Sequence, residues 1–163
     1  MEAEGTLSLI AEVSIAFAGF TSVVGVFGAR DEQWSSSQLS SLRLLIETSL
    51  IMLLTALLPL ALYSTGLPTT ESWRLASGIK AAQMLVYWLF SFRRHQQDLA
   101  SLPRAFAWAS VAFDGILFAV HILNASGFFQ IPAAPYVIHL YYLMLAACVS
   151  FIGMMAPLWR QGE

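Results

Sequence analysis

The sequence has few charged residues and almost no cysteine. Only 11% of its 163 residues are Asp, Glu, Lys or Arg, whereas 58% are hydrophobic. So little polar surface cannot cover a soluble globule of this length. The single cysteine, Cys148, excludes an intramolecular disulfide and a cysteine-based metal cluster. We therefore expect a protein that lies in a lipid bilayer.

Motifs for nucleotide binding and for hydrolysis are also missing. The sequence contains no Walker A motif, no Rossmann glycine pattern, no HExxH and no GxSxG. It has no basic tail either, so no nucleic-acid partner is expected. These absences favour a protein that is not an enzyme, and they exclude nucleotide-driven transport by this chain alone.

Five apolar segments are each long enough to cross a membrane. Crossing a hydrocarbon core of ~30 Å takes roughly 20 mostly apolar residues in a helix. The predicted helices cover residues 7–28, 42–64, 73–92, 103–124 and 135–158. Because the links are short, we expect residues 1–163 to form a single transmembrane domain, an all-α bundle of five helices. The expected location is the plasma membrane or a bacterial inner membrane.

Basic residues near the ends of these segments lie mostly on one side. The larger group consists of Arg30, Arg43, Arg93, Arg94, Arg104 and Arg160, whereas only Arg74 falls on the opposite side. Loops rich in Lys and Arg remain in the cytoplasm. The sequence therefore predicts an N-terminus outside and a C-terminus in the cytoplasm.

Several ionisable residues fall inside the predicted spans, where their cost makes them functional candidates. Asp114 lies near the middle of its segment, so it must be protonated, paired with a cation or in contact with water. Glu47 follows Arg43 by four residues, a spacing that predicts a local ion pair near the cytoplasmic edge.

Two neighbouring segments each carry a stripe of polar residues at helical spacing. The stripe of the third segment contains Ser77, Lys80, Gln83 and Tyr87, and that of the fourth contains Ser110, Asp114, His121 and Asn124. In a membrane helix such a stripe usually faces the bundle interior, an oligomer interface or water. It is either a wet path or a dry hydrogen-bonded seam between helices.

Small residues recur at helical spacing along the first segment, a pattern that predicts close packing against another helix. They are Ala11, Ser14, Ala18, Thr21, Gly25 and Gly28. Such a row allows another helix to approach closely. Together with the lack of an internal repeat, it favours a homo-oligomer.

The leading hypothesis is a homo-oligomeric channel or small transporter, without a cofactor, for protons, ions or a small solute. Its path would be formed by Asp114, Lys80, Glu12, Gln83, Tyr87, His121, His139 and Ser110. One alternative is a redox membrane subunit in which His121 and His139 hold haem b between helices. Another is a noncatalytic membrane assembly or interaction protein, in which the polar stripes are packing seams.

Overall fold

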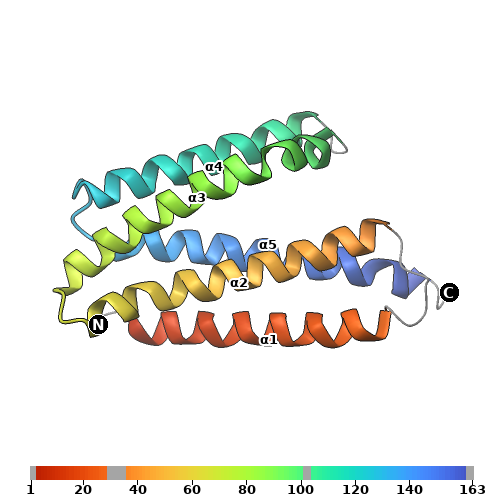
Figure 1. The fold of residues 1–163 in the computed structure, drawn as a ribbon, viewed down its shortest axis with the longest axis horizontal. Helices are drawn as coiled ribbons and strands as arrows, with labels where there is room; N and C mark the ends of the chain where they lie inside the picture. The colour runs from red at the N-terminus through yellow and green to blue at the C-terminus, as the bar shows by residue number, and fades with distance from the viewer. Residues whose placement is uncertain (1–2, 29–35, 101–103, 161–163) are drawn as a thin grey trace. The chain divides into compact units, whose positions relative to one another are not determined.

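The described part of the chain is entirely helical. The computed structural model describes residues 3–28, 36–100 and 104–160, and the side chains of residues 3–25, 38–90 and 111–155. Its five helices are α1 (Glu4–Gly28), α2 (Ser36–Ser64), α3 (Thr69–Ala100), α4 (Arg104–Ala125) and α5 (Ala133–Arg160) (Figure 1). The predicted all-α fold class and the number of helices are confirmed for these residues.

Most of the helices are longer than the apolar segments that predicted them. α2 begins at Ser36 rather than near residue 42, and α3 runs from Thr69 to Ala100 rather than from 73 to 92. Most of the added residues are polar or charged, and most of those at the end of α3 are good helix formers. Apolar residues indicate where lipid would be, whereas the helical backbone continues until a glycine, a proline or a capping residue stops it.

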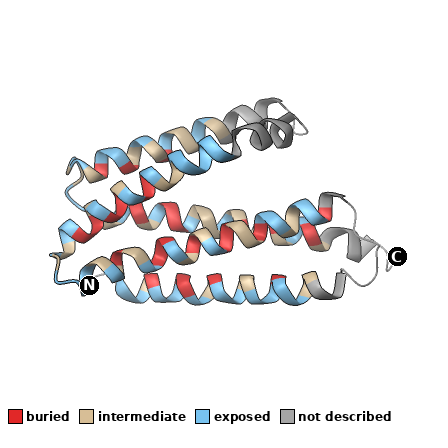
Figure 2. Cartoon of the chain, in the orientation of Figure 1, coloured by how far each residue is buried: buried red, intermediate tan, exposed pale blue. Residues whose placement is uncertain are grey.

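Within the described residues, three helices are long and apolar enough to cross a membrane. Their apolar stretches are Glu4–Gly25, Gln38–Ser64 and Ala133–Met155, and α4 contributes a shorter one, Val111–Ala125. Large apolar side chains are exposed on all five helices, among them Leu9, Leu54, Leu89, Ile116 and Leu145 (Figure 2). Soluble monomers rarely expose so much apolar surface. These helices could cross a membrane and suggest a multi-pass membrane protein.

The chain divides into two compact units, residues 1–60 with 137–163, and residues 61–136. In the first unit, α1, α2 and α5 run side by side (Figure 1). Leu45 from α2 and Ala147 and Met154 from α5 form its buried apolar cluster, and Phe17 from α1 packs against them. Phe17 also meets Phe151 of α5, with ring centroids 6.3 Å apart.

The small-residue row of α1 is largely used within the chain. Ala11, Ser14 and Thr21 are buried, and a Cβ added to Gly25 would lie 3.7 Å from Leu42 Cδ2 of α2. Because this row packs against the chain's own helices, it gives no support to the predicted homo-oligomer, which stays a prediction.

Buried hydroxyls in this first unit are satisfied by their own helices. Ser14 Oγ donates to the carbonyl of Ile10 at 2.6 Å, and Ser49 Oγ donates to that of Leu45 at 2.6 Å. Thr21 Oγ1 likewise donates a hydrogen bond to the carbonyl of Phe17, four residues earlier on α1. Such bonds remove the need for a polar partner on another helix or for water.

The second unit contains α3 and α4, which pair as an antiparallel hairpin (Figure 1). α4 ends in a tight turn in which the amide of Gly127 donates to the carbonyl of Asn124, and that of Phe128 to that of Leu123. This is the Schellman arrangement, which places a residue with positive φ directly after the helix. Gly127 has φ +85°. A Cβ there would also lie 3.1 Å from the Arg74 guanidinium carbon of α3.

We expect Gly127→Ala to lower the free energy of unfolding by about 1 kcal/mol, because an L-residue is strained at this φ and Arg74 would have to move. Thermal unfolding followed by circular dichroism in detergent measures the change. The matched control is Gly19→Ala, since Gly19 lies within α1 and an added Cβ there meets nothing within 4 Å. This control should gain stability, by roughly 0.5–1 kcal/mol. Equal behaviour of the two variants would contradict the strain argument.

Candidate functional site

A buried polar cluster joins α3 to α4 at the end of the hairpin next to the Gly127 turn. Asn124 Nδ2 donates to Ser77 Oγ at 2.7 Å and to the carbonyl oxygen of Pro132 at 2.8 Å. Asn124 and Ser77 are both fully buried. One amide group therefore ties together α3, α4 and the segment that leads into α5.

Lys80 lies one turn further along α3 and only 2% of its surface is exposed. Its ammonium group donates to Gln83 Oε1 at 3.2 Å. His121 of α4 is also fully buried. A buried cation and a buried imidazole thus belong to the same helix pair.

Aromatic rings close this cluster. His121 meets Tyr136 edge-on, with ring centroids 5.6 Å apart, and Tyr136 meets Trp73 in the same way at 5.5 Å. All three side chains are buried. This packing holds the imidazole in a fixed orientation and separates it from the surroundings.

One acceptor in the cluster is not used within the described part of the chain. Asn124 Oδ1 is buried there and accepts no hydrogen bond from any described residue. A buried amide oxygen without a donor is costly, by about 1–3 kcal/mol. At such a group a water molecule would gain a favourable hydrogen bond.

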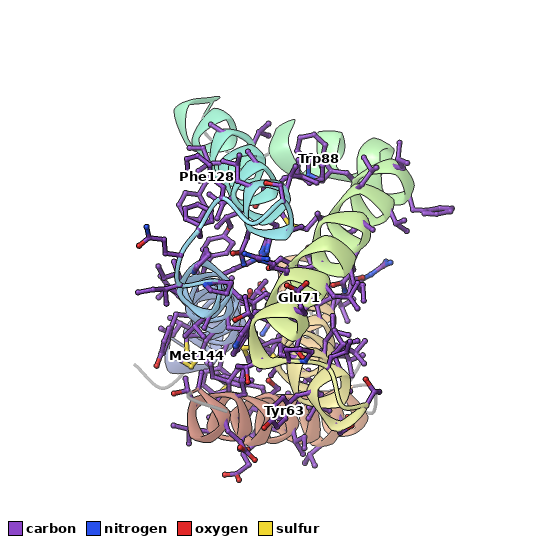
Figure 3. All side chains as sticks on the ribbon, turned by 90° about the vertical axis from the view of Figure 1, so that its left-hand side faces the viewer. Tyr63, Glu71, Trp88, Phe128 and Met144 are labelled. Atoms are coloured by element: carbon purple, nitrogen blue, oxygen red, sulfur yellow. The ribbon has the colours of Figure 1, made fainter. Side chains whose placement is uncertain are left out.

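Asp114 lies two turns from His121 on α4, about 10 Å along the helix axis. It borders a hollow of about 130 Å³ between α3 and α4, whose other lining residues are Met84, Leu85, Trp88, Gly115 and Phe118. Figure 3 marks Trp88 on its helix. Asp114 is half-buried, so its carboxylate is neither in the tightly packed cluster nor fully exposed.

The other predicted site residues are scattered. Glu12 is exposed on α1, Gln83 is half-buried, and Tyr87 is 40% exposed. The polar stripe of α3 is therefore buried at Ser77 and Lys80 and turns outward by Tyr87. Ser110 lies outside the described side chains. Because Glu12 and Lys80 belong to different compact units, their predicted grouping stays a prediction.

The local pair between Arg43 and Glu47 is present in the structure. Arg43 Nε donates to Glu47 Oε1 at 2.8 Å, and the arginine side chain is 61% exposed. An exposed pair of this kind contributes little to stability, about 0.3–0.5 kcal/mol on a helix. It needs no role in transport.

The two histidines proposed as haem ligands fall in different compact units. His139 is 3% exposed, and its ring centroid lies 6.2 Å from that of Tyr142 on α5. Within the described residues, no three His, Cys, Asp or Glu side chains gather to hold a metal ion. The haem alternative stays a prediction.

Sequence reasoning missed the aromatic and carbonyl partners of this site. Trp73, Pro132 and Tyr136 were not among the predicted site residues. Their contacts depend on how the chain returns after the turn at Gly127. Two features of the sequence do point to this site. They are the helical spacing of His121 and Asn124 and the presence of Gly127 shortly after them.

Comparison with known proteins adds no relative. The chain matches no protein family, no curated protein and no solved structure. No family is shown. The function must therefore be argued from the site itself.

Proposed function

We propose that this protein is an integral membrane transporter or channel for a proton, an ion or a small solute, with its path along the α3–α4 pair. The observation that carries the proposal is that Lys80 of α3 and His121 of α4 are both buried, in a helix pair whose other long sides are apolar and exposed. Ionisable groups inside a membrane are costly and mark ion pathways or proton relays. Asp114 and the unused oxygen of Asn124 extend the same face of α4.

The proposal includes five membrane crossings. Three helices are apolar enough to cross by themselves, whereas α3 and α4 carry the polar groups and would cross as a pair. It also includes self-association, because the chain shows no internal repeat that would let one copy enclose a path. Chemical cross-linking of the protein in liposomes measures the copy number, and a monomer at all lipid ratios would contradict this part.

Flux measurements test the central claim. Purified protein in liposomes should carry protons or ions faster than empty liposomes, which pH-sensitive and ion-sensitive dyes trapped inside would report. A series of monovalent cations, anions and small neutral solutes defines what passes. No flux of any of these would contradict transport.

That result would favour a second candidate, a membrane assembly protein. Its support is the direct bonding of Asn124 to Ser77 and Pro132, which is typical of a dry seam between helices. In this case the polar cluster fixes the register of α3 against α4 and transports no ion or solute.

The proposed topology predicts opposite locations for the two termini. A tag placed before Met1 should be accessible from outside intact cells, and a reporter fused after Glu163 should respond from the cytoplasm, because six basic residues lie on the predicted inner side and one on the outer. Protease protection and reporter activity check this. Finding both termini on one side would overturn the odd number of crossings.

A further inference from the structure

One face of α1 is left uncovered in the unit that α1 forms with α2 and α5. The opposite face is buried in that unit and includes Leu7 and Ile10. On the uncovered face, Leu9, Ile15 and Val23 are exposed (Figure 2). Because α1 is apolar enough to cross a membrane, such a face would meet either lipid or another helix.

Glu12 places a carboxyl group on this uncovered face. It is exposed, and it is the one charged residue of α1 beyond the first turn. It lies two to three residues from the middle of the apolar stretch Glu4–Gly25, about 4 Å along the helix axis. α1 contains no basic residue, so no neighbour one turn away can pair with Glu12. A carboxylate at this depth in lipid is costly without a partner.

The described side chains of the same unit offer no exposed cation for Glu12. Arg43 of α2 pairs with Glu47 at 2.8 Å, and His139 of α5 is buried. A second copy that docked through the same face by two-fold symmetry would bring one Glu12 carboxylate against another. The charge that complements this face is therefore a cation from a different protein.

An open hollow next to Glu12 gives the face a shape that a helix can fit. Its volume is about 270 Å³, and its lining residues come from α1 and α5: Val13, Ala16, Phe17, Phe20 and Phe151. Ala16 follows Glu12 by one turn of α1. Gly19 leaves more space on the helix, since a Cβ added there would meet nothing within 4 Å. A neighbouring helix could therefore place an apolar side chain in the hollow while a basic residue meets Glu12.

We propose that this face of α1 docks a transmembrane helix of another protein, one that carries a single lysine or arginine near the middle of its span. Glu12 pairs with the basic residue, and the hollow at Ala16 and Phe20 receives an apolar side chain of the same helix. Each charge alone is costly in lipid, so pairing stabilises both helices and selects the partner by its charge. The inference rests on the membrane crossing of α1 in the proposed function, and it goes beyond transport because it places the chain in a complex.

Association with synthetic transmembrane peptides tests the docking face. The probes are three leucine–alanine peptides of equal length, with lysine, methionine or glutamate at the central position and an acceptor dye on each. The full-length protein carries a donor dye on a tag after Glu163, and energy transfer is measured in liposomes. We expect the lysine peptide to associate about tenfold or more tightly than the methionine peptide, and the glutamate peptide not to associate. Equal association of the lysine and methionine peptides would overturn the proposal.

Variants separate the charge from the hollow. Glu12→Gln should make the lysine and methionine peptides associate equally, because it removes the carboxylate and keeps the size of the side chain. The control Glu47→Gln also removes a carboxylate, one that is bonded to Arg43 on α2, and should keep the parental preference. Ala16→Leu fills the hollow and should weaken association of both peptides roughly fivefold or more. An unchanged preference in Glu12→Gln would place the docking elsewhere and contradict the proposal.

Further outcomes distinguish docking from transport and from contacts within or between copies. Preference for the lysine peptide in liposomes without flux would support docking and contradict transport, whereas flux without that preference would do the reverse. Energy transfer between two labelled copies of the parent that is lost in Glu12→Gln would assign the face to a second copy and overturn the proposal. Tighter association of the lysine peptide with Lys80→Met than with the parent would show that Lys80 competes for Glu12, which would also overturn it. Should Glu12→Gln fail to fold by circular dichroism, the three peptides on the parent still decide.

Discussion

Lys80→Met is expected to reduce flux through the reconstituted protein to the level of empty liposomes while leaving the helical fold intact. The substitution removes the buried ammonium and its bond to Gln83 Oε1 but keeps a side chain of similar length. A lysine near the centre of a membrane helix costs ~2.5–3.5 kcal/mol on insertion scales, so methionine should fold at least as well. Loss of flux without loss of fold would mean that the charge is needed for function.

The control for this experiment is Arg43→Met. It also exchanges a cation for methionine, but the Arg43 side chain is 61% exposed and bonds only locally to Glu47 among the described groups. Flux in this variant should equal that of the parent. If Lys80→Met also transported at the parental rate, the buried lysine would have no part in the mechanism, and the dry-seam interpretation would gain support.

Asn124→Ala should lower the free energy of unfolding by about 1–3 kcal/mol, because it removes two buried hydrogen bonds and leaves the Pro132 carbonyl without its donor. Titration of detergent micelles with sodium dodecyl sulfate, followed by circular dichroism, measures this change. Ser126→Ala is the control, since the exposed Ser126 hydroxyl bonds only to the carbonyl of Leu123 on the preceding turn. Its effect should stay within about 0.5 kcal/mol.

Equal stability of Asn124→Ala and the parent would show that water replaces these bonds at no cost. That result would mean that the end of the hairpin is wet. It would favour an open path beside Ser77 over a closed seam.

The fold was predictable as far as hydrophobicity determines it. Each of the five apolar segments forms a helix in the described residues, because a helix pairs its backbone groups within a single segment. The ends of α3 were not predictable in this way. Helix formation continues through the polar residues after Phe92, where apolar content no longer reports on the backbone.

The site was predictable only where contacts are local. Arg43 and Glu47 are four residues apart on one helix, so their pairing follows from spacing. The stripes of α3 and α4 also follow from spacing, but the register that brings Asn124 to Ser77 depends on how two helices pack. The contact of Asn124 with Pro132 depends further on the turn at Gly127, a tertiary detail that periodicity does not contain.

The hydroxyls that bond to their own helices have a consequence for how the chain enters a membrane. Ser14 of α1 and Ser49 of α2 carry their hydrogen-bond partners with them, so these helices can leave the insertion machinery singly. Asn124 has its partners on α3 and beyond the turn, and among the described residues α3 has no stretch apolar enough to cross alone. If the proposed five crossings hold, we therefore expect α3 to enter lipid only once α4 has been made, with the two helices entering together.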